Sequence, residues 1–179
     1  LSFDVIYLVM DPGYNPINRK KIESNAALLE VPIQIFETHI FDVANKQTKS
    51  PCYLCARMRR GHLYAKAKEL GCNKIALGHH MSDVIETVVM AMMNSSKLET
   101  IVPKVHSLNF EGMELIRPMY RINEADIIAW ARYNGLEFIQ CACRFTETTS
   151  RDNAETTSRR RETKELIRQL KKTNPEIET

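Results

Sequence analysis

The chain has 179 residues, of which 44% are hydrophobic and 26% are charged, and its formal net charge is only +3. This composition is typical of a soluble globular protein, and the length suffices for one substantial core. The longest apolar stretches fall well short of the roughly 20 residues that span a bilayer, and no signal peptide opens the chain. We therefore expect a cytoplasmic protein without a membrane partner. The charge permits a nucleic-acid partner without requiring one.

The first part of the chain predicts a βαβ unit. Residues 3–10 have the pattern of a short buried strand, and the turn formers at 11–16 end it. Apolar residues at helical spacing predict a helix over 18–31. Residues 32–36 then alternate like a second strand.

A second βα step is predicted next. Residues 52–70 have the pattern of a helix that ends at Gly71, and residues 73–77 read as a third apolar strand. The Gly-His-His run at 78–80 joins this strand to an apolar helix, for which Ser82 is the predicted N-cap.

The remaining elements complete the predicted fold class. Residues 105–116 predict a hairpin or an extended excursion, Asn123 is expected to cap a helix that ends at Gly135, and residues 137–140 predict a last strand. Short strands alternating with helices indicate an α/β fold, with a mostly parallel sheet covered by helices on both faces. In such folds ligands bind beyond the carboxyl ends of the strands.

The five cysteines need a chemical explanation. Their odd number and the missing secretory signal favour metal or redox chemistry over a disulfide framework. Cys52 and Cys55, at a helix start, can direct two thiolates at one metal ion or cluster, and Cys141 and Cys143 can add one or two more. Four cysteines could close a zinc site, whereas three would leave an open position on an iron-sulfur cluster. Cys72 stands alone and reads as a buried, unligated thiol.

A second candidate site is the Gly-His-His-x-x-Asp run at 78–83. A glycine at a strand end permits close approach of a phosphate or ribose, and the following helix N-terminus favours anions. Asp83 could hold Mg²⁺ or a catalytic proton. The alternative is that the histidines are structural and that Asp83 only offsets the helix macrodipole.

Basic residues gather in two places on predicted helices. The first cluster contains Arg57, Arg59, Arg60, Lys66 and Lys68, and the second contains Arg159, Arg160, Arg161 and Lys164. The simpler interpretation of either cluster alone is a solvated helix face.

Together these motifs resemble a known family. The cysteine run at 51–61 is followed by Lys-Ile-Ala-Leu-Gly-His-His at 74–80, by Asp83 and by the Glu-Thr pair at 86–87. The segments at 117–120, 141–143 and 174–179 continue the similarity in the same order. This order is similar to that of the tRNA 2-thiocytidine synthetase (TtcA) group of the PP-loop ATPase superfamily, over nearly the whole chain.

The resemblance implies the Rossmann-like three-layer fold of the adenine nucleotide alpha hydrolases (the HUP class). It also implies an enzyme that adenylates a tRNA base at its carbonyl carbon with ATP and Mg²⁺, after which sulfur replaces the activated oxygen and AMP and pyrophosphate are released. Its partners would be tRNA and a sulfur donor, either a cysteine desulfurase or sulfide. The oligomeric state stays open, with a homodimer as one alternative.

Roles follow for the cysteines and for the basic residues. Cys52, Cys55 and Cys143 would hold a four-iron four-sulfur cluster, with Cys141 as the alternative third ligand and zinc as the alternative metal. The residues implied to bind tRNA are Arg57, Arg60, Arg159, Arg160 and Arg161.

Other roles concern ATP and catalysis. Asp83 would act in the ATP and catalytic centre, with Gly78 and His79 lining it. Arg59 stands where relatives place a basic residue close to both the cluster and the substrate, and Asp11 would lie near the adenine.

One departure from the family concerns the phosphate loop. The Ser-Gly-Gly-x-Asp-Ser loop is expected just before Leu1 and is absent, so we expect a fragment that shows negligible pyrophosphate release alone. The predicted division is a PP-loop α/β domain over 1–145 and a polar loop with a basic helix over 146–179. Rival hypotheses are thiolation of a different base, a lysidine-type ligase, and a catalytically silent tRNA-binding or iron-sulfur module.

Overall fold

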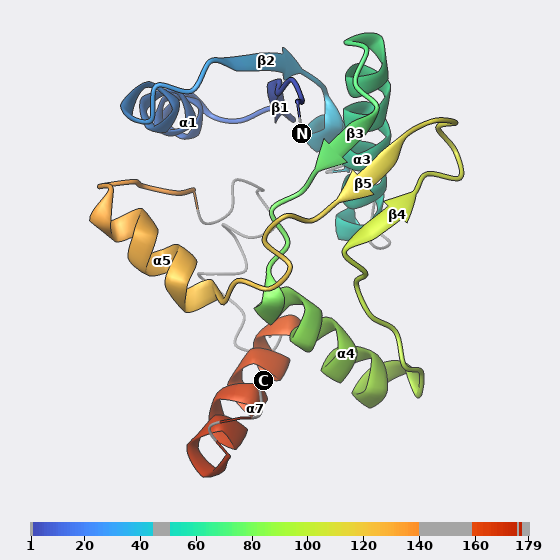
Figure 1. Ribbon diagram of the computed structural model, residues 1–179, viewed down its shortest axis with the longest axis vertical. Coiled ribbons are helices and arrows are strands. Elements are labelled where there is room, and N and C mark those ends of the chain that lie inside the picture. Colours follow the sequence, from blue (N-terminus) through green and yellow to red (C-terminus); the bar gives the residue numbers. More distant parts are fainter. Residues whose placement is uncertain (1, 45–50, 140–158, 175, 177–179) are drawn as a thin grey trace. The chain divides into compact units, whose positions relative to one another are not determined.

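The computed structural model describes residues 2–44, 51–139, 159–174 and 176. The chain forms two compact units (Figure 1). The first unit contains Leu1–Cys72 and Ala131–Asp152, and the second contains Asn73–Trp130 and Asn153–Thr179. The described residues form both helices and strands, and two of the three strand pairs are parallel, which confirms the predicted α/β class.

The first unit begins with the predicted βαβ element. Strands β1 (Tyr7–Asp11) and β2 (Ile33–Glu37) pair in parallel, and α1 (Pro16–Leu28) connects them. A parallel pair needs such a crossover because its strands run in the same direction. The side chain of Asn15 accepts a hydrogen bond from the Asn18 amide at 2.8 Å, and Pro16 occupies the first turn. These two predicted turn formers therefore begin α1.

The start of the first predicted strand was wrong. Residues 3–6 are not in a strand, and Phe3 is 78% exposed. A strand needs a hydrogen-bonding neighbour, and β2 pairs only with residues 7–11. The predicted burial was also wrong at the start of β1, where Tyr7 pairs with β2 and is nevertheless exposed.

Two further helices of the first unit pack on each other. They are α2 (Ile40–Ala44) and α3 (Pro51–Glu69). Buried apolar side chains from both helices contribute to the core, among them Ile40, Phe41, Tyr64 and Ala67. The chain leaves α3 through Gly71, whose φ of +76° is the left-handed conformation that glycine adopts readily, so this predicted helix end is confirmed.

The second unit contains a three-stranded sheet in the order β3-β5-β4. Its strands are β3 (Lys74–Ala76), β4 (Lys104–His106) and β5 (Glu114–Ile116). Strand β5 runs parallel to β3 and antiparallel to β4, so the predicted hairpin is confirmed (Figure 1).

The helix after β3 starts earlier than predicted. Helix α4 (Met81–Ser95) has His80, not Ser82, at its N-cap position. Ser82 lies in the first turn of α4 and not before it. Its hydroxyl caps a different helix, α5 (Glu124–Tyr133), by accepting a hydrogen bond at 3.3 Å from the amide of Glu124. Asn123 does precede α5, and its carbonyl accepts the first helical hydrogen bond. Its predicted side-chain cap was wrong, because Asn123 Oδ1 accepts no hydrogen bond from the described residues and the Ser82 hydroxyl takes the Glu124 amide.

The predicted strand at 137–140 was wrong for residues 137–139, and residue 140 lies outside the described residues. The side-chain amide of Asn25 takes both main-chain groups of Glu137, donating to its carbonyl at 2.8 Å and accepting from its amide at 3.3 Å. Hydrogen bonds that a neighbouring strand would supply are therefore made to a helix side chain. The basic helix α7 (Arg159–Thr173) is present and packs on α4.

Candidate functional site

An acidic side chain lies where the sequence predicts it, just beyond the carboxyl end of β3. Gly78 is exposed in the short link to α4, and a Cβ added there would lie 3.3 Å from Cε of Met119, so a larger residue would be crowded. In the first turn of α4, Asp83 Oδ2 accepts a hydrogen bond from the amide of His80 at 3.1 Å. This places a half-buried carboxylate at a helix N-terminus next to an open strand end.

His79 lies in the same link and is half-buried. Burial and the positive charge of Arg117 lower the pKa of His79. Within the described part of the chain, its Nδ1 is buried without a hydrogen-bond partner. The neutral form of the imidazole is thus favoured at neutral pH, and Nδ1 can still form a hydrogen bond with a ligand.

Arg160 lies beside Asp83, and 47% of its side chain stays exposed. Its Nη2 is 3.5 Å from Asp83 Oδ1, and its Nε is 3.0 Å from Oε2 of Glu86, close enough for an ion pair but not aligned for a hydrogen bond. Glu86 is only 3% exposed, and burial raises its pKa although Lys164 and Arg160 act against that rise. One residue predicted to bind tRNA therefore contacts the predicted catalytic acid.

In the first unit, Asp11 ends β1 and is buried. Its Oδ1 accepts hydrogen bonds from the amides of Gly13 and Tyr14 at 2.9 and 2.7 Å, and its Oδ2 is 3.1 Å from Nη1 of Arg19. Burial raises the pKa of Asp11, but these hydrogen bonds outweigh it and hold the pKa below its usual value. Asp11 thus fixes the turn that follows β1, with both carboxylate oxygens already engaged.

Arg59 lies on α3, and its guanidinium carbon is 5.7 Å from the ring centroid of Phe41. That ring also makes an edge-to-face contact with Tyr14, at 5.9 Å between centroids. Within the described residues, Arg59 Nε is buried without a hydrogen-bond partner. A cation held over an aromatic ring keeps unused donors, and it lies one helical turn beyond the half-buried Cys55.

The other predicted metal ligands are only partly covered by the structure. The backbone of α3 places Cys52 one turn before Cys55, but the Cys52 side chain lies outside the described residues, as do Cys141 and Cys143 entirely. Among the side chains that are described, no group of three His, Cys, Asp or Glu residues is arranged to hold a metal ion.

The remaining predicted tRNA-binding residues lie on two helices. Arg57 and Arg60 are exposed on α3, and Arg161 is exposed on α7. Arg159 begins α7, but its side chain lies outside the described residues. Arg160 is exposed as well, and its guanidinium pairs with Asp83 and Glu86.

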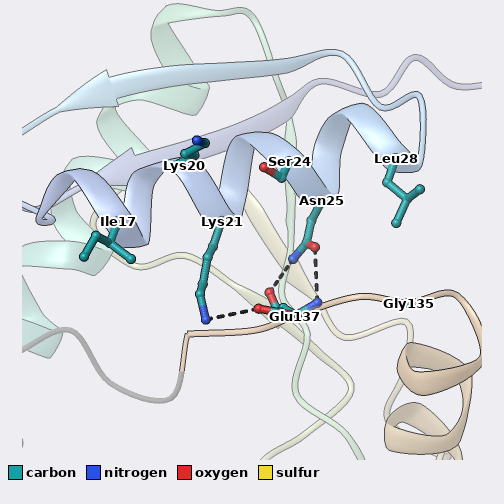
Figure 2. Close-up of a pocket in the computed structure, with 8 residues that line it drawn as sticks. All are labelled: Ile17, Lys20, Lys21, Ser24, Asn25, Leu28, Gly135 and Glu137. Carbon is teal, nitrogen blue, oxygen red and sulfur yellow. Dashed lines mark hydrogen bonds and ion pairs between the residues drawn. The ribbon is translucent and has the colours of Figure 1, made fainter.

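An open cavity of about 450 Å³ lies between α1 and residues 135–137 of the same unit. Figure 2 shows Lys21 and Asn25 pointing from the helix toward Glu137, with Lys21 Nζ 3.3 Å from a Glu137 carboxylate oxygen. Apolar side chains, including Ile17 and Leu28, line the two ends. The cavity contains none of the residues that the sequence singled out.

Comparison with known proteins decides the family. A family model described as the PP-loop domain matches residues 17–157. The chain belongs to the PP-loop family. This assignment confirms the resemblance that the cysteine run and the Gly-His-His-x-x-Asp motif indicated.

Curated relatives of this PP-loop chain are named tRNA-cytidine(32) 2-sulfurtransferase. The protein of that name from Geobacter sulfurreducens is 30% identical over 99% of this chain and 67% of its own length. Its counterpart from Syntrophotalea carbinolica is 33% identical over 99% of this chain and 66% of its own length. The chain thus spans about two thirds of these relatives.

A solved structure with the same fold is that of the U34-tRNA thiolase NcsA from Methanococcus maripaludis, which contains its 4Fe-4S cluster. The TM-score is 0.73 at 20% sequence identity, covering 98% of this chain and 58% of that chain. This likeness confirms the PP-loop α/β fold. Within the described residues of the PP-loop chain, no helix is both long and apolar enough to span a membrane.

Two features of the candidate site were missed in the sequence analysis. Glu86 was noted only as part of the motif, although an acidic residue in a helix that is otherwise apolar is a signal of a buried charge. Phe41 gave no signal at all, because its contact with Arg59 depends on the packing of α2 against α3.

Proposed function

We propose that this protein is an ATP-dependent tRNA-thiolating enzyme that forms 2-thiocytidine. The observation that carries the proposal is the match to curated tRNA-cytidine(32) 2-sulfurtransferases along 99% of the chain. In the proposed reaction the base carbonyl oxygen attacks the α-phosphorus of ATP and pyrophosphate leaves. Sulfur then attacks the carbonyl carbon, and the activated oxygen leaves with AMP.

Asp83 is the proposed acidic residue of the ATP and catalytic centre, where it would hold Mg²⁺. Its support is its position in the first turn of α4, beyond the carboxyl end of β3, where ligands of α/β folds bind. Gly78 would let a phosphate or ribose approach, and His79 would line the site as a neutral imidazole, consistent with its lowered pKa. Asp11 would serve the adenine side by fixing the turn after β1.

The proposed metal group is a four-iron four-sulfur cluster held by Cys52, Cys55 and Cys143, with Cys141 as the alternative third ligand. The residues present fit such a group, because α3 places Cys52 and Cys55 one turn apart and Cys55 is half-buried. A cluster with three protein ligands supplies an open iron position that can bind sulfur. Arg59 supports the same interpretation, since its cation lies one turn from Cys55 with a buried donor unused.

Binding of tRNA is proposed for Arg57 and Arg60 on α3 and for Arg159 and Arg161 on α7. Such residues neutralise phosphates, so the affinity for tRNA should fall steeply as salt is raised. A cysteine desulfurase or sulfide is the proposed sulfur donor. The proposed location is the cytoplasm, and a homodimer is the proposed assembly.

The test is anaerobic reconstitution with iron and sulfide, followed by metal analysis and a thiolation assay on tRNA. The complete product of the gene is used, so that any sequence beyond residues 1–179 is present. We expect about four irons per chain in the wild type, lost in Cys52→Ala and Cys143→Ala. Comparison with Cys141→Ala identifies the third ligand, and Cys72→Ala, outside the proposed set, is the matched control that keeps its iron.

Two results would overturn the proposal. Zinc alone, or no metal, in the reconstituted wild type would remove the cluster and point to a structural or thiol-based role for the cysteines. A wild type that is loaded with iron but forms no 2-thiocytidine with ATP would instead favour another base or a silent module.

A further inference from the structure

The side of α7 that packs on α4 carries two cations, Arg160 and Lys164, whose side chains are 47% and 39% exposed. Thr163 and Ile167 are 2% and 7% exposed and lie one turn apart on this helix, which packs on α4. Arg160 and Lys164 lie at the same helical face, because residues spaced by three or four positions are neighbours on a helix. The packed face of α7 therefore presents both apolar and cationic groups to α4.

These cations meet two carboxylates that are one turn apart on α4. The Arg160 guanidinium spans both, with Nε 3.0 Å from Glu86 Oε2 and Nη2 3.5 Å from Asp83 Oδ1. Lys164 Nζ lies 3.5 Å from the other oxygen of Glu86 and 2.9 Å from a carboxylate oxygen of Glu124. Each carboxylate on α4 is thus paired from α7.

The pairing matters because the carboxylates are shielded from water. The Asp83 and Glu86 side chains are 18% and 4% exposed. Two like charges in such a place repel each other unless a cation lies between them. The amide of His80 already holds Asp83 Oδ2, so Arg160 acts on the remaining oxygen. Together they restrict the Asp83 carboxylate to one orientation.

We propose that Arg160 is a positioning residue that orients Asp83 from α7, rather than a contact for tRNA phosphates. This proposal rests on the proposed function, in which Asp83 serves the ATP and catalytic centre. The planar guanidinium suits the task, since it can reach two carboxylates at once, whereas a lysine ammonium is a single point charge. Packing of α7 on α4 then completes the proposed catalytic centre around Asp83, and Arg159 and Arg161 of the same helix remain for tRNA.

The test compares Arg160→Gln and Arg160→Lys in the complete gene product with two other variants of α7. Arg161→Gln removes a neighbouring exposed cation, and Glu165→Gln is an exposed change that controls for altering the helix surface. Three quantities are measured: the single-turnover rate of pyrophosphate release with ATP and saturating unmodified tRNA transcript, the affinity for that transcript over a salt series, and hydrogen exchange of residues 81–87.

We expect Arg160→Gln to lower the single-turnover rate by about 10- to 100-fold, the effect of misplacing a catalytic group. Exchange in residues 81–87 should rise, while tRNA affinity and its salt dependence stay at wild-type values. Arg160→Lys should recover part of the rate, and it carries the test if the glutamine variant does not fold. Arg161→Gln should weaken tRNA binding and reduce the salt slope by about 0.7 to 0.9. Glu165→Gln should match the wild type in rate.

The opposite pattern would overturn the proposal. It would fail if Arg160→Gln weakened tRNA binding and flattened the salt slope as Arg161→Gln does, with the rate at saturating tRNA unchanged. Failure of the proposed function is a different result, because it would be seen as an inactive wild type. In that case the exchange of residues 81–87 still decides whether Arg160 holds the first turn of α4.

Discussion

Replacing Asp11 tests whether one carboxylate holds the turn after β1. Its Oδ1 accepts two backbone hydrogen bonds, from Gly13 at 2.9 Å and Tyr14 at 2.7 Å. A hydrogen bond to a charged group contributes about 1.5–3 kcal/mol, so Asp11→Ala, which leaves two amides without their acceptor, should lower the free energy of unfolding by about 3 kcal/mol. Asp11→Asn keeps an oxygen at the same place and loses only the charge opposite Arg19, which should cost about 1 kcal/mol.

The measurement is urea denaturation at pH 7, with Glu23→Gln as the control. Glu23 also pairs with Arg19, at 3.2 Å, but its side chain is 50% exposed and does not contact the turn, so its loss should cost less than about 0.5 kcal/mol. If Asp11→Ala proved no more destabilising than Glu23→Gln, the turn would not depend on the carboxylate.

The pH dependence of the same variants has a fixed sign. The pKa of Asp11 is lowered in the folded protein from its usual 3.8, because hydrogen bonds outweigh the effect of burial. The charge therefore stabilises the fold fully above pH 3.8, and this contribution is lost as the pH falls through the lower folded pKa. The stability difference between wild type and Asp11→Asn should shrink in acid, and a difference that grew would contradict the assignment.

Two further predictions concern the strand β5 and the helix α1. Hydrogen bonds from two lysines on the flanking strands lower the pKa of Glu114 from 4.5 to about 2, so Glu114→Gln should lower the melting temperature at pH 7. The difference in melting temperature between wild type and variant should be largest above pH 4.5 and should vanish as the pH falls toward 2. An equal difference at pH 7 and pH 2 would refute this. Asn25→Ala should cost about 1 kcal/mol in urea unfolding because both hydrogen bonds to the main chain of Glu137 are lost, and Ser24→Ala, beside it on α1, should leave stability within about 0.5 kcal/mol of wild type.

Local signals predicted the elements that depend on local chemistry. Asn15 and Pro16 start α1, Gly71 follows the end of α3, and the turn formers between β4 and β5 close a hairpin. Each of these three features depends on backbone conformations or capping hydrogen bonds within a few residues, so the local sequence predicts it. The position of Asp83 was predicted for a similar reason, since a strand end and a helix start both have short-range signatures.

Long-range contacts decided the features that the sequence could not predict. Residues 137–139 have the pattern of a strand, yet the main-chain amide and carbonyl of Glu137 bond to Asn25, more than a hundred positions away. Ser82 has the chemistry of an N-cap, and it does cap a helix, but the helix is α5. In both cases the polar group found the kind of partner that its chemistry requires, and only tertiary packing determined which one.

The second basic cluster shows why a run of charges is not one surface. Consecutive residues on a helix are about 100° apart, so four cations within six positions cannot all face the same way. Arg160 and Lys164 both pair with the buried Glu86 of α4, with 47% and 39% of their side chains exposed, and Arg161 lies about 100° further around the helix. A cation already paired in the folded protein releases fewer counterions when a polyanion binds. We therefore expect the cluster to contribute less to tRNA affinity than its charge suggests, because Arg160 has the proposed role of orienting Asp83 at the start of α4.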